Sequence, residues 1–186
     1  MLLMTLLWGC MNDGLIKTEQ PNPGLEPIEY DPIYWEACSY QTEDHVCDFT
    51  YANAMDTTTT LYDHYGKIVV MKYFTEWCPY CRDAAERVDE LVDDEVEVLH
   101  IMLQNQYGLE PNQDDAERWA NAFNHSYETV LRAGDYIKDP NAEWGPDVEA
   151  YPSFIIVDED MVVKYKIKGW SWEMIQQIVS DMKSQE

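Results

Sequence analysis

The chain has 186 residues, of which 46% are hydrophobic, and a formal net charge of −24 at pH 7. This length suits one ordinary domain with a tail or an insertion, and the apolar content is enough for a sizeable core. The acids are spread along the chain, so the surface repels nucleic acid and anionic lipid, and we expect no nucleic-acid partner. The charge itself is interpreted as a solvated acidic surface, with attraction to basic partners as the alternative.

The N-terminus carries the short apolar run MLLMTLLWG, which ends at Cys10. The run is too short to span a bilayer and is typical of a signal-peptide core. LWGC resembles a bacterial lipoprotein signal, although Trp8 is bulky where such signals have a small residue and no basic residue precedes the run. We expect residues 1–9 to be a signal peptide and Cys10 to be the lipidated mature N-terminus. A cytosolic apolar N-terminus is the alternative.

A tether is predicted for residues 10–35. This segment has few apolar residues and no helical or strand period. Its prolines are Pro21, Pro23, Pro27 and Pro32. Such a segment would hold a folded domain, residues 36–186, away from the membrane that binds the lipid anchor.

Strand and helix patterns alternate along the rest of the chain. Residues 47–66 are expected to add a strand or a hairpin ahead of the main pattern. Nearly continuous apolar runs at 68–74 and 96–103 are typical of strands buried on both faces. A helix is predicted after each run. Apolar residues from Cys81 to Val92 follow a helical stripe, and 114–123 begins with acids that suit a helix N-terminus.

The C-terminal part is predicted to end in a hairpin and a helix. Residues 124–150 have no readable period and are treated as an irregular insertion. The apolar run 154–157 predicts a third buried strand. A turn at 158–160 then leads to an alternating strand at 161–168, whose exposed lysines suit a sheet edge. Ser171 is placed to N-cap a final helix, and the whole pattern is that of an α/β domain.

The sequence WCPYC places two cysteines between a predicted strand and a predicted helix. Pro79 suits the first helical position, which puts Cys78 at the helix N-terminus, where unpaired N–H groups stabilise a thiolate. The thiolate is the nucleophile in disulfide exchange. Cys81 lies one turn further on and should be more buried. We therefore expect Cys78 to form the mixed disulfide with a partner and Cys81 to resolve it.

Two other interpretations of the cysteine pair are a zinc site and a structural disulfide. A structural zinc site takes four ligands, usually from two such pairs, and the sequence has one, so we expect no metal. A purely structural Cys78–Cys81 bond would close too small a loop to stabilise the fold much. A redox pair remains the leading interpretation.

WCPYC after a buried strand, followed by YPSFIIVDED at 151–160, resembles the thioredoxin superfamily. In that family a cis-proline precedes the third strand and packs against the CxxC motif, and Pro152 matches it. The lead-in from 47 to 67 is similar to the TlpA/ResA-like branch, which is membrane-anchored and extracytoplasmic. The resemblance covers residues 45–183. It implies a thioredoxin-like fold, with a central mixed sheet flanked by helices, an N-terminal strand or hairpin extension and a helical insertion.

The resemblance also implies an activity and its partners. The implied activity is thiol–disulfide oxidoreduction at the bacterial cell envelope, on the periplasmic face, with a redox-active Cys78–Cys81 disulfide and no other cofactor. The partners would be protein thiols or disulfides and a redox partner protein. The residues assigned to substrate binding are Trp77, Pro79, Tyr80, Tyr151 and Pro152. Trp77 would be a surface platform beside Cys78, and Tyr151 would either narrow the substrate groove or simply pack.

Several positions depart from the family pattern. Lys72 stands where thioredoxins have a buried Asp, and it shares a strand face with Val70 and Phe74. A charged amine there would favour a thiolate, and a neutral one could accept a proton. A lysine that reaches water along its stem is the alternative. Ala84 replaces a Glu typical of cytochrome-maturation members, which argues against that specific role. Glu76 is the other residue assigned to support the cysteine pair.

The direction of electron flow stays open. CPYC resembles the motif of glutaredoxins, whose potentials are about −200 to −230 mV, but the surrounding fold also sets the potential. Cys38 and Cys47 are expected to form a structural disulfide in an oxidising compartment. The alternative is a second redox pair that passes electrons to Cys78 and Cys81.

Two further functions are alternatives, a copper-binding chaperone and a peroxidase. A copper-binding chaperone of the same fold would use soft ligands, and Met71 and Met102 lie on neighbouring predicted strands. Such relatives usually have CxxxC and a histidine before the third strand. The histidines of this chain are interpreted as surface or satisfied residues; they are His45, His64, His100 and His125. A peroxiredoxin-like peroxidase is suggested by Thr75, three residues before Cys78, but Met71 stands where such enzymes have a proline.

Overall fold

The computed structural model describes residues 35, 37–135, 146 and 148–184. The predicted signal peptide, Cys10 and nearly all of the predicted tether lie outside these residues, so these three expectations stay predictions. In the part of the chain that the structure describes, no helix is both long and apolar enough to cross a bilayer.

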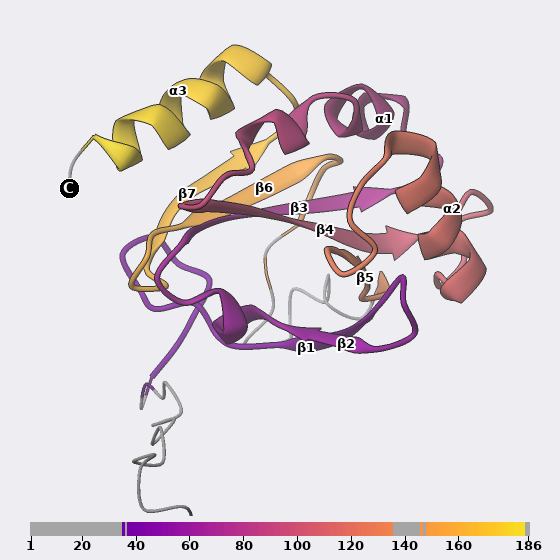
Figure 1. The fold of residues 1–186 in the computed structure, drawn as a ribbon, viewed down its shortest axis with the longest axis horizontal. Helices are drawn as coiled ribbons and strands as arrows, with labels where there is room; N and C mark the ends of the chain where they lie inside the picture. Colours follow the sequence, from indigo (N-terminus) through magenta and orange to yellow (C-terminus); the bar gives the residue numbers. More distant parts are fainter. Residues whose placement is uncertain (1–34, 36, 136–145, 147, 185–186) are drawn as a thin grey trace, which may run out of the picture. The chain divides into compact units, whose positions relative to one another are not determined.

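The strands form one seven-stranded mixed sheet in the order β2-β1-β5-β4-β3-β6-β7 (Figure 1). The strands are β1 (Thr50–Asn53), β2 (Thr58–Thr60), β3 (Ile68–Thr75), β4 (Val96–Gln104), β5 (Val130–Arg132), β6 (Ser153–Val157) and β7 (Val163–Lys168). β3 pairs in parallel with β4, and β4 with β5, whereas β6 is antiparallel to both β3 and β7. The predicted mixed sheet, the N-terminal hairpin and the edge strand at 161–168 are confirmed.

Helices cover one face of this sheet (Figure 1). They are α1 (Pro79–Ala85), the short 3₁₀ helix η2 (Val88–Leu91), α2 (Gln113–Phe123) and α3 (Trp172–Lys183); a further 3₁₀ helix, η1 (Leu61–His64), follows β2. Side chains alternate along the central strands, so β3 turns Val70 and Phe74 toward the helices. Every residue of β3 is buried, which explains its continuous apolar run.

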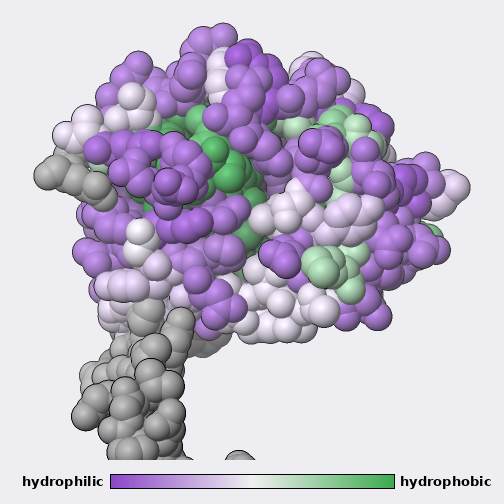
Figure 2. Space-filling model, viewed as in Figure 1, coloured by the Kyte–Doolittle hydropathy of each residue, from purple (hydrophilic) through white to green (hydrophobic). Residues whose placement is uncertain are grey.

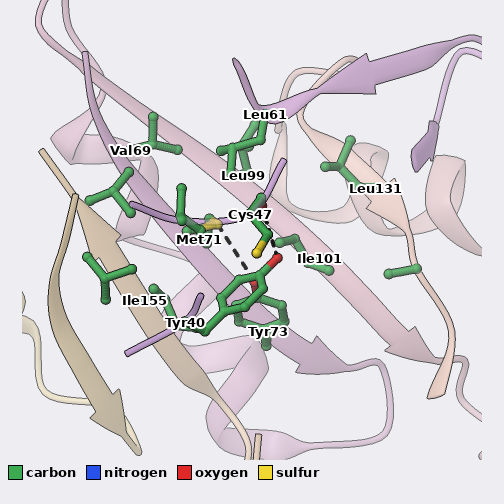
Figure 3. Packing of buried hydrophobic residues seen from close by; sticks show 14 of the residues in the cluster. Tyr40, Cys47, Leu61, Val69, Met71, Tyr73, Leu99, Ile101, Leu131 and Ile155 are labelled. Carbon is green, nitrogen blue, oxygen red and sulfur yellow. Dashed lines mark hydrogen bonds between the residues drawn. The ribbon is translucent and has the colours of Figure 1, made fainter. Parts of the chain in front are cut away.

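The other face of the sheet is covered by the segment that precedes β1 and by its neighbours. Val69, Met71 and Tyr73 of β3 point to this side and pack with Leu99 and Ile101 of β4 (Figure 3). Tyr40 and Cys47 close the same core. The solvent-facing surface in the view of Figure 2 is mostly hydrophilic, as the acidic composition requires.

The helix ends follow their sequence signals. Pro79 occupies the first turn of α1. Ser171 Oγ accepts a hydrogen bond from the Met174 N–H at 3.5 Å, which confirms it as the N-cap of α3. Asn112 and Asp115 form a reciprocal capping box at the start of α2.

Two element predictions are wrong. The single helix expected from Cys81 to Val92 ends at Ala85, and η2 follows it, which leaves Val92 exposed. The backbone leaves the helical region at Arg87, with φ −131°, and the Arg87 guanidinium stacks over the Trp172 ring at 4.3 Å. Residues 124–150 are also not wholly irregular, because they contain β5. That strand has three residues and is defined by its pairing with β4 and β1 rather than by any local period.

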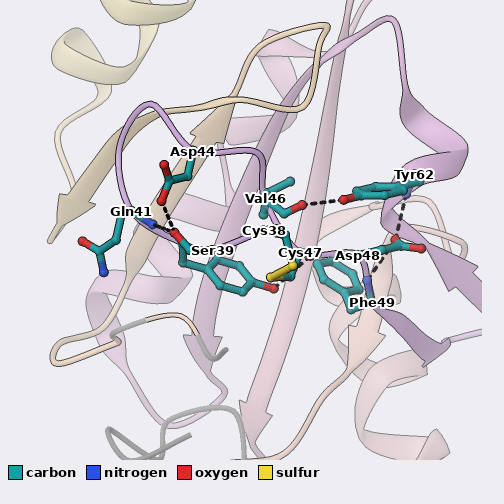
Figure 4. The surroundings of a disulfide bond; sticks show 10 residues. Cys38, Ser39, Gln41, Asp44, Val46, Cys47, Asp48, Phe49 and Tyr62 are labelled. Carbon is teal, nitrogen blue, oxygen red and sulfur yellow. Dashed lines mark hydrogen bonds between the residues drawn. A yellow bond between two sulfur atoms is a disulfide. The ribbon is translucent and has the colours of Figure 1, made fainter. Parts of the chain in front are cut away.

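The expected Cys38–Cys47 disulfide is present, with an S–S distance of 2.10 Å. It lies among local hydrogen bonds, including Ser39 Oγ to Asp44 at 2.6 Å and Tyr62 Oη to the Val46 carbonyl at 2.6 Å (Figure 4). Both cysteines pack in the core on the face of the sheet opposite the helices. The sheet therefore separates this disulfide from Cys78 and Cys81, which favours the structural interpretation over direct electron transfer.

Candidate active site

Cys78 lies at the junction between β3 and α1. Its backbone is extended, with φ −79° and ψ 117°, and it is the N-cap of α1. The Cys78 Sγ accepts a hydrogen bond from the Cys81 N–H at 3.2 Å. Pro79 follows directly and has no N–H to leave unpaired. The local sequence thus aims the sulfur of Cys78 at the first turn of the helix, as predicted.

Both thiols are free and buried, and Cys81 is enclosed completely. Burial raises the pKa of the Cys81 thiol, and its contact with Cys78 raises it further, while Lys72 acts in the opposite direction. Cys81 is therefore held as a neutral thiol in the reduced protein. It has to lose a proton before it can attack a mixed disulfide on Cys78.

The Tyr151–Pro152 peptide bond is cis, as the resemblance implies. It comes just before β6, which is antiparallel to β3 with Ser153 opposite Tyr73. Pro152 therefore lies at the end of the sheet where β3 leads into the cysteine pair. Tyr151 packs against the hydrophobic cores on both faces of the sheet, so the predicted packing role is confirmed.

Aromatic side chains form a rim beside Cys78. The Trp77 ring makes an edge contact with the Tyr151 ring at 5.9 Å, and its Nε1 donates to Gln104 Oε1 at 2.9 Å. Trp77 is 49% exposed and Tyr80 is 65% exposed. These rings offer an apolar surface next to the nucleophile, where a protein partner could dock.

Glu76 lies two residues before Cys78 and is buried in a network of hydrogen bonds. Its carboxylate accepts two hydrogen bonds from Arg118 of α2, at 2.8 and 2.7 Å. It also accepts one from the Gln106 N–H at 2.9 Å. Arg118 in turn donates to Asp115 at 2.6 Å. A bidentate pair of this kind fixes the relative position of the two side chains. Glu76, which directly precedes Trp77, is therefore held against α2 and the loop after β4.

Lys72 is 0% exposed, so the alternative in which its amine reaches water is wrong. Among the described residues its Nζ has no hydrogen-bond partner. It lies over the rings of Phe74 at 5.0 Å and Trp119 at 5.3 Å. Burial lowers the pKa of Lys72 to about 7, against the opposing pull of Cys81, Asp89 and Cys78. The amine is therefore poised to gain or lose a proton near neutral pH.

A second polar cluster lies on the same face of the sheet, and the sequence analysis missed it. Asp89 of η2 bonds His100 Nε2 through Oδ1 at 2.8 Å and His125 Nδ1 through Oδ2 at 2.5 Å. Both histidines are buried and each hydrogen-bonds Asp89, so of the two expected states, surface or satisfied, they have the second at the nitrogen that faces Asp89. The strand periodicity places His100 on the face of Lys72, but no local signal in the sequence points to Asp89 or His125.

The possible metal-ligand atoms of this cluster lie within 4.8 Å of one another. The two imidazoles are stacked, with centroids 3.8 Å apart and planes at 25°. The lone pairs of such rings lie in nearly parallel planes that are stacked one above the other, so they do not meet at one ion about 2.0–2.1 Å from both nitrogens. The residues are better described as a hydrogen-bonded cluster. Met71 and Met102 also face opposite sides of the sheet, so they cannot share a copper ion.

A family model described as AhpC/TSA family matches residues 42–166. The chain belongs to the AhpC/TSA family. Among curated proteins, this family member is 22% identical over 117 residues to the thioredoxin-like protein YneN of Bacillus subtilis. The match covers 63% of this chain and 65% of YneN, so less than two thirds of that relative is spanned.

Solved structures resemble this AhpC/TSA chain in fold. A DsbF homologue from Corynebacterium diphtheriae aligns with a TM-score of 0.60 and 17% identity, covering 74% of this chain and 86% of that one. The pneumococcal exposed lipoprotein thioredoxin Etrx1 of Streptococcus pneumoniae aligns with a TM-score of 0.55 and 20% identity, over 73% and 99%. The fold is thus thioredoxin-like, as the sequence resemblance implies.

Replacing Lys72 by Met should stabilise the fold in a pH-dependent way. The native amine has a pKa of about 7 against an ordinary 10.5, so unfolding takes up a proton between these values. Stability of the wild type is therefore lost as pH falls from 10.5 to about 7. Lys72→Met should gain on the order of 4 kcal/mol at pH 7 and about half of that at pH 9, measured by denaturant unfolding. An equal gain at both pH values would contradict the lowered pKa.

Proposed function

We propose that this chain is a thiol–disulfide oxidoreductase that exchanges disulfides with proteins through Cys78 and Cys81. The observation that carries the proposal is the position of the two thiols. Cys78 caps α1 beside an aromatic rim, and Cys81 lies one turn deeper with no exposed surface. A pair arranged in this way separates the group that meets the partner from the group that resolves the product.

The reaction proceeds in two exchanges. The Cys78 thiolate attacks a substrate disulfide, which forms a mixed disulfide and releases one substrate thiolate. The Cys81 sulfur then attacks Cys78 Sγ, which forms the Cys78–Cys81 disulfide and releases the second thiolate. Two electrons pass from the cysteine pair to the substrate, and the proton of Cys81 leaves its thiol. A reducing partner protein runs the same steps in reverse.

Lys72 is proposed to act in both exchanges. As an ammonium it stabilises a thiolate on the cysteine pair, which favours the reduced form. As a neutral amine it accepts the proton that Cys81 has to lose. A pKa of about 7 makes both states available at physiological pH.

An extracytoplasmic, lipid-anchored location is proposed on three observations. The Cys38–Cys47 disulfide is stable in an oxidising compartment. LWGC at residues 7–10 resembles a lipoprotein signal. Etrx1, which shares the fold, is described as an exposed lipoprotein. The anchor would be on Cys10, with the following residues as the tether.

Serine variants test the redox pair. Cys78→Ser should abolish reduction of insulin disulfides, because the nucleophile is lost. Cys81→Ser should accumulate mixed disulfides on Cys78, visible by mass spectrometry without reductant. The control is the double variant Cys38→Ser/Cys47→Ser, which should keep its activity per folded molecule because its disulfide lies across the sheet. Undiminished insulin reduction by Cys78→Ser would overturn the proposal.

Lipidation is tested on the protein expressed from the full chain in a bacterium. Mass spectrometry of the membrane-extracted protein should find Cys10 as the N-terminal residue, carrying acyl chains. Cys10→Ser should release the protein from the membrane fraction. An unprocessed N-terminus on protein recovered from the cytoplasm would rule the anchor out.

A further inference from the structure

Lys72 and His100 are neighbours in the sheet. They are register partners on the parallel strands β3 and β4, and strand alternation turns both side chains toward the helices. Both residues are 0% exposed. Within the described residues, neither Lys72 Nζ nor His100 Nδ1 has a hydrogen-bond partner. Unpaired buried nitrogens are costly and rare, so two on adjacent strands call for an explanation.

Asp89 determines where the ring protons lie. Burial would raise the pKa of its carboxyl group, but the hydrogen bonds from His100 and His125 outweigh burial and lower it. An ionised carboxylate only accepts, so each imidazole must donate to it. The pKa of His100 is lowered to about 3, mainly by burial, so this ring is neutral near pH 7. A neutral ring that donates from Nε2 leaves a bare lone pair on Nδ1.

The cluster connects the sealed interior to water. The Asp89 side chain is 33% exposed on η2, whereas Lys72, His100 and Cys81 have no exposed surface. His125 binds the second carboxylate oxygen and stacks on His100, which holds Asp89 and the ring together. A proton that leaves Cys81 for Lys72 is therefore enclosed, and Asp89 is the member of the cluster that reaches solvent.

We propose that His100 and Asp89 relay protons between Lys72 and solvent, with His125 as a positioning residue. The inference rests on the proposed redox function of Cys78 and Cys81. As Cys81 sulfur bonds to Cys78, its proton passes across one water to Lys72 Nζ, which has no hydrogen-bond partner among the described residues. Because the two nitrogens do not hydrogen-bond each other, Lys72 then gives a proton to His100 Nδ1 across one bridging water. At the same time His100 Nε2 gives its own proton to Asp89 Oδ1, and Asp89 releases it to bulk water. One proton leaves, and no buried imidazolium accumulates.

The relay resets in each catalytic cycle. Outward transfer leaves His100 protonated on Nδ1 instead of Nε2. When a reducing partner restores the two thiols, Cys81 needs a proton, and the same transfers run inward and return the ring to its first tautomer. Because oxidation and reduction of the cysteine pair alternate, a relay through one histidine returns to its starting tautomer after each cycle.

Other charged groups near Lys72 affect its protonation, so the test variants leave them unchanged unless they are the residue under test. The titratable or charged groups near it are Cys78 at the N-cap of α1, Cys81 and Arg82 from α1, Asp89 from η2, His100 from β4 and His125 after α2. Arg82 and Lys72 share the Trp119 ring, whose centroid is 5.6 Å from the Arg82 guanidinium carbon and 5.3 Å from Lys72 Nζ.

The test separates the two exchanges. Reduced protein is mixed with dithiobis(nitrobenzoic acid), which releases one thionitrobenzoate when Cys78 attacks and a second when Cys81 resolves the adduct. His100→Gln keeps an N–H donor for Asp89 but cannot pass a proton from one ring atom to another. We expect the first release to be unchanged and the second to slow by about tenfold or more near pH 7. Lys72→Met should slow the same step and move its pH dependence upward.

The matched control is His64→Gln. His64 also has a buried nitrogen, Nε2, without a partner, but it belongs to η1 and is outside the cluster. Its variant should show both releases at the wild-type rate. A second release in folded His100→Gln that keeps the wild-type rate and profile between about pH 6 and about pH 9 overturns the relay.

Two further outcomes are distinguished. Where His100→Gln does not fold, Asp89→Asn at the partly exposed end serves in its place, and a wild-type second release in that variant also overturns the relay. A wild-type protein that never gives a second release contradicts the proposed function itself. A purely structural cluster predicts altered unfolding of His100→Gln with an unaltered second step.

Discussion

The amine of Lys72 is buried between β3 and the helices, beside the cysteine pair. It lies over two aromatic rings, those of Phe74 and Trp119. Removing an ammonium from water is expensive, and a ring face at this distance returns only about 2 kcal/mol even when dry. The surroundings therefore leave the amine close to equal populations of its charged and neutral forms. The chemistry proposed for Cys78 and Cys81 depends on this balance between the charged and neutral amine. Each disulfide exchange changes the protonation or charge of a cysteine sulfur beside Lys72.

The rest of the helix face is arranged around that balance. α1 begins at the cysteine pair and ends after seven residues, and the break that follows lets η2 direct Asp89 toward β4. α2 supplies Trp119, whose ring contacts the amine, and Arg118, which holds Glu76. A longer, regular α1 would satisfy the apolar stripe in the sequence, but it would not place a carboxylate between two histidines. The local irregularity thus coincides with the polar cluster.

Much of the fold could be predicted because the signals were local. Strand and helix periods, the proline after Cys78 and the cap at Ser171 each act over a few residues, and the face of Lys72 followed from alternation. What could not be predicted depends on long-range pairing. β5 has three residues and exists because β4 and β1 pair with it. Asp89, His100 and His125 come from three separate segments, so no spacing in the sequence brings them together.

The protonation of Lys72 can be measured directly. Nitrogen-15 lysine NMR, with Lys72→Met to assign the signal, gives the amine pKa in the oxidised and in the reduced protein. The account predicts a pKa near 7 in the reduced protein and a lower one in the oxidised protein, because a thiolate on the cysteine pair favours the ammonium and a Cys78–Cys81 disulfide carries no charge. A pKa near the ordinary 10.5, or one that does not change between the two redox states, would contradict it.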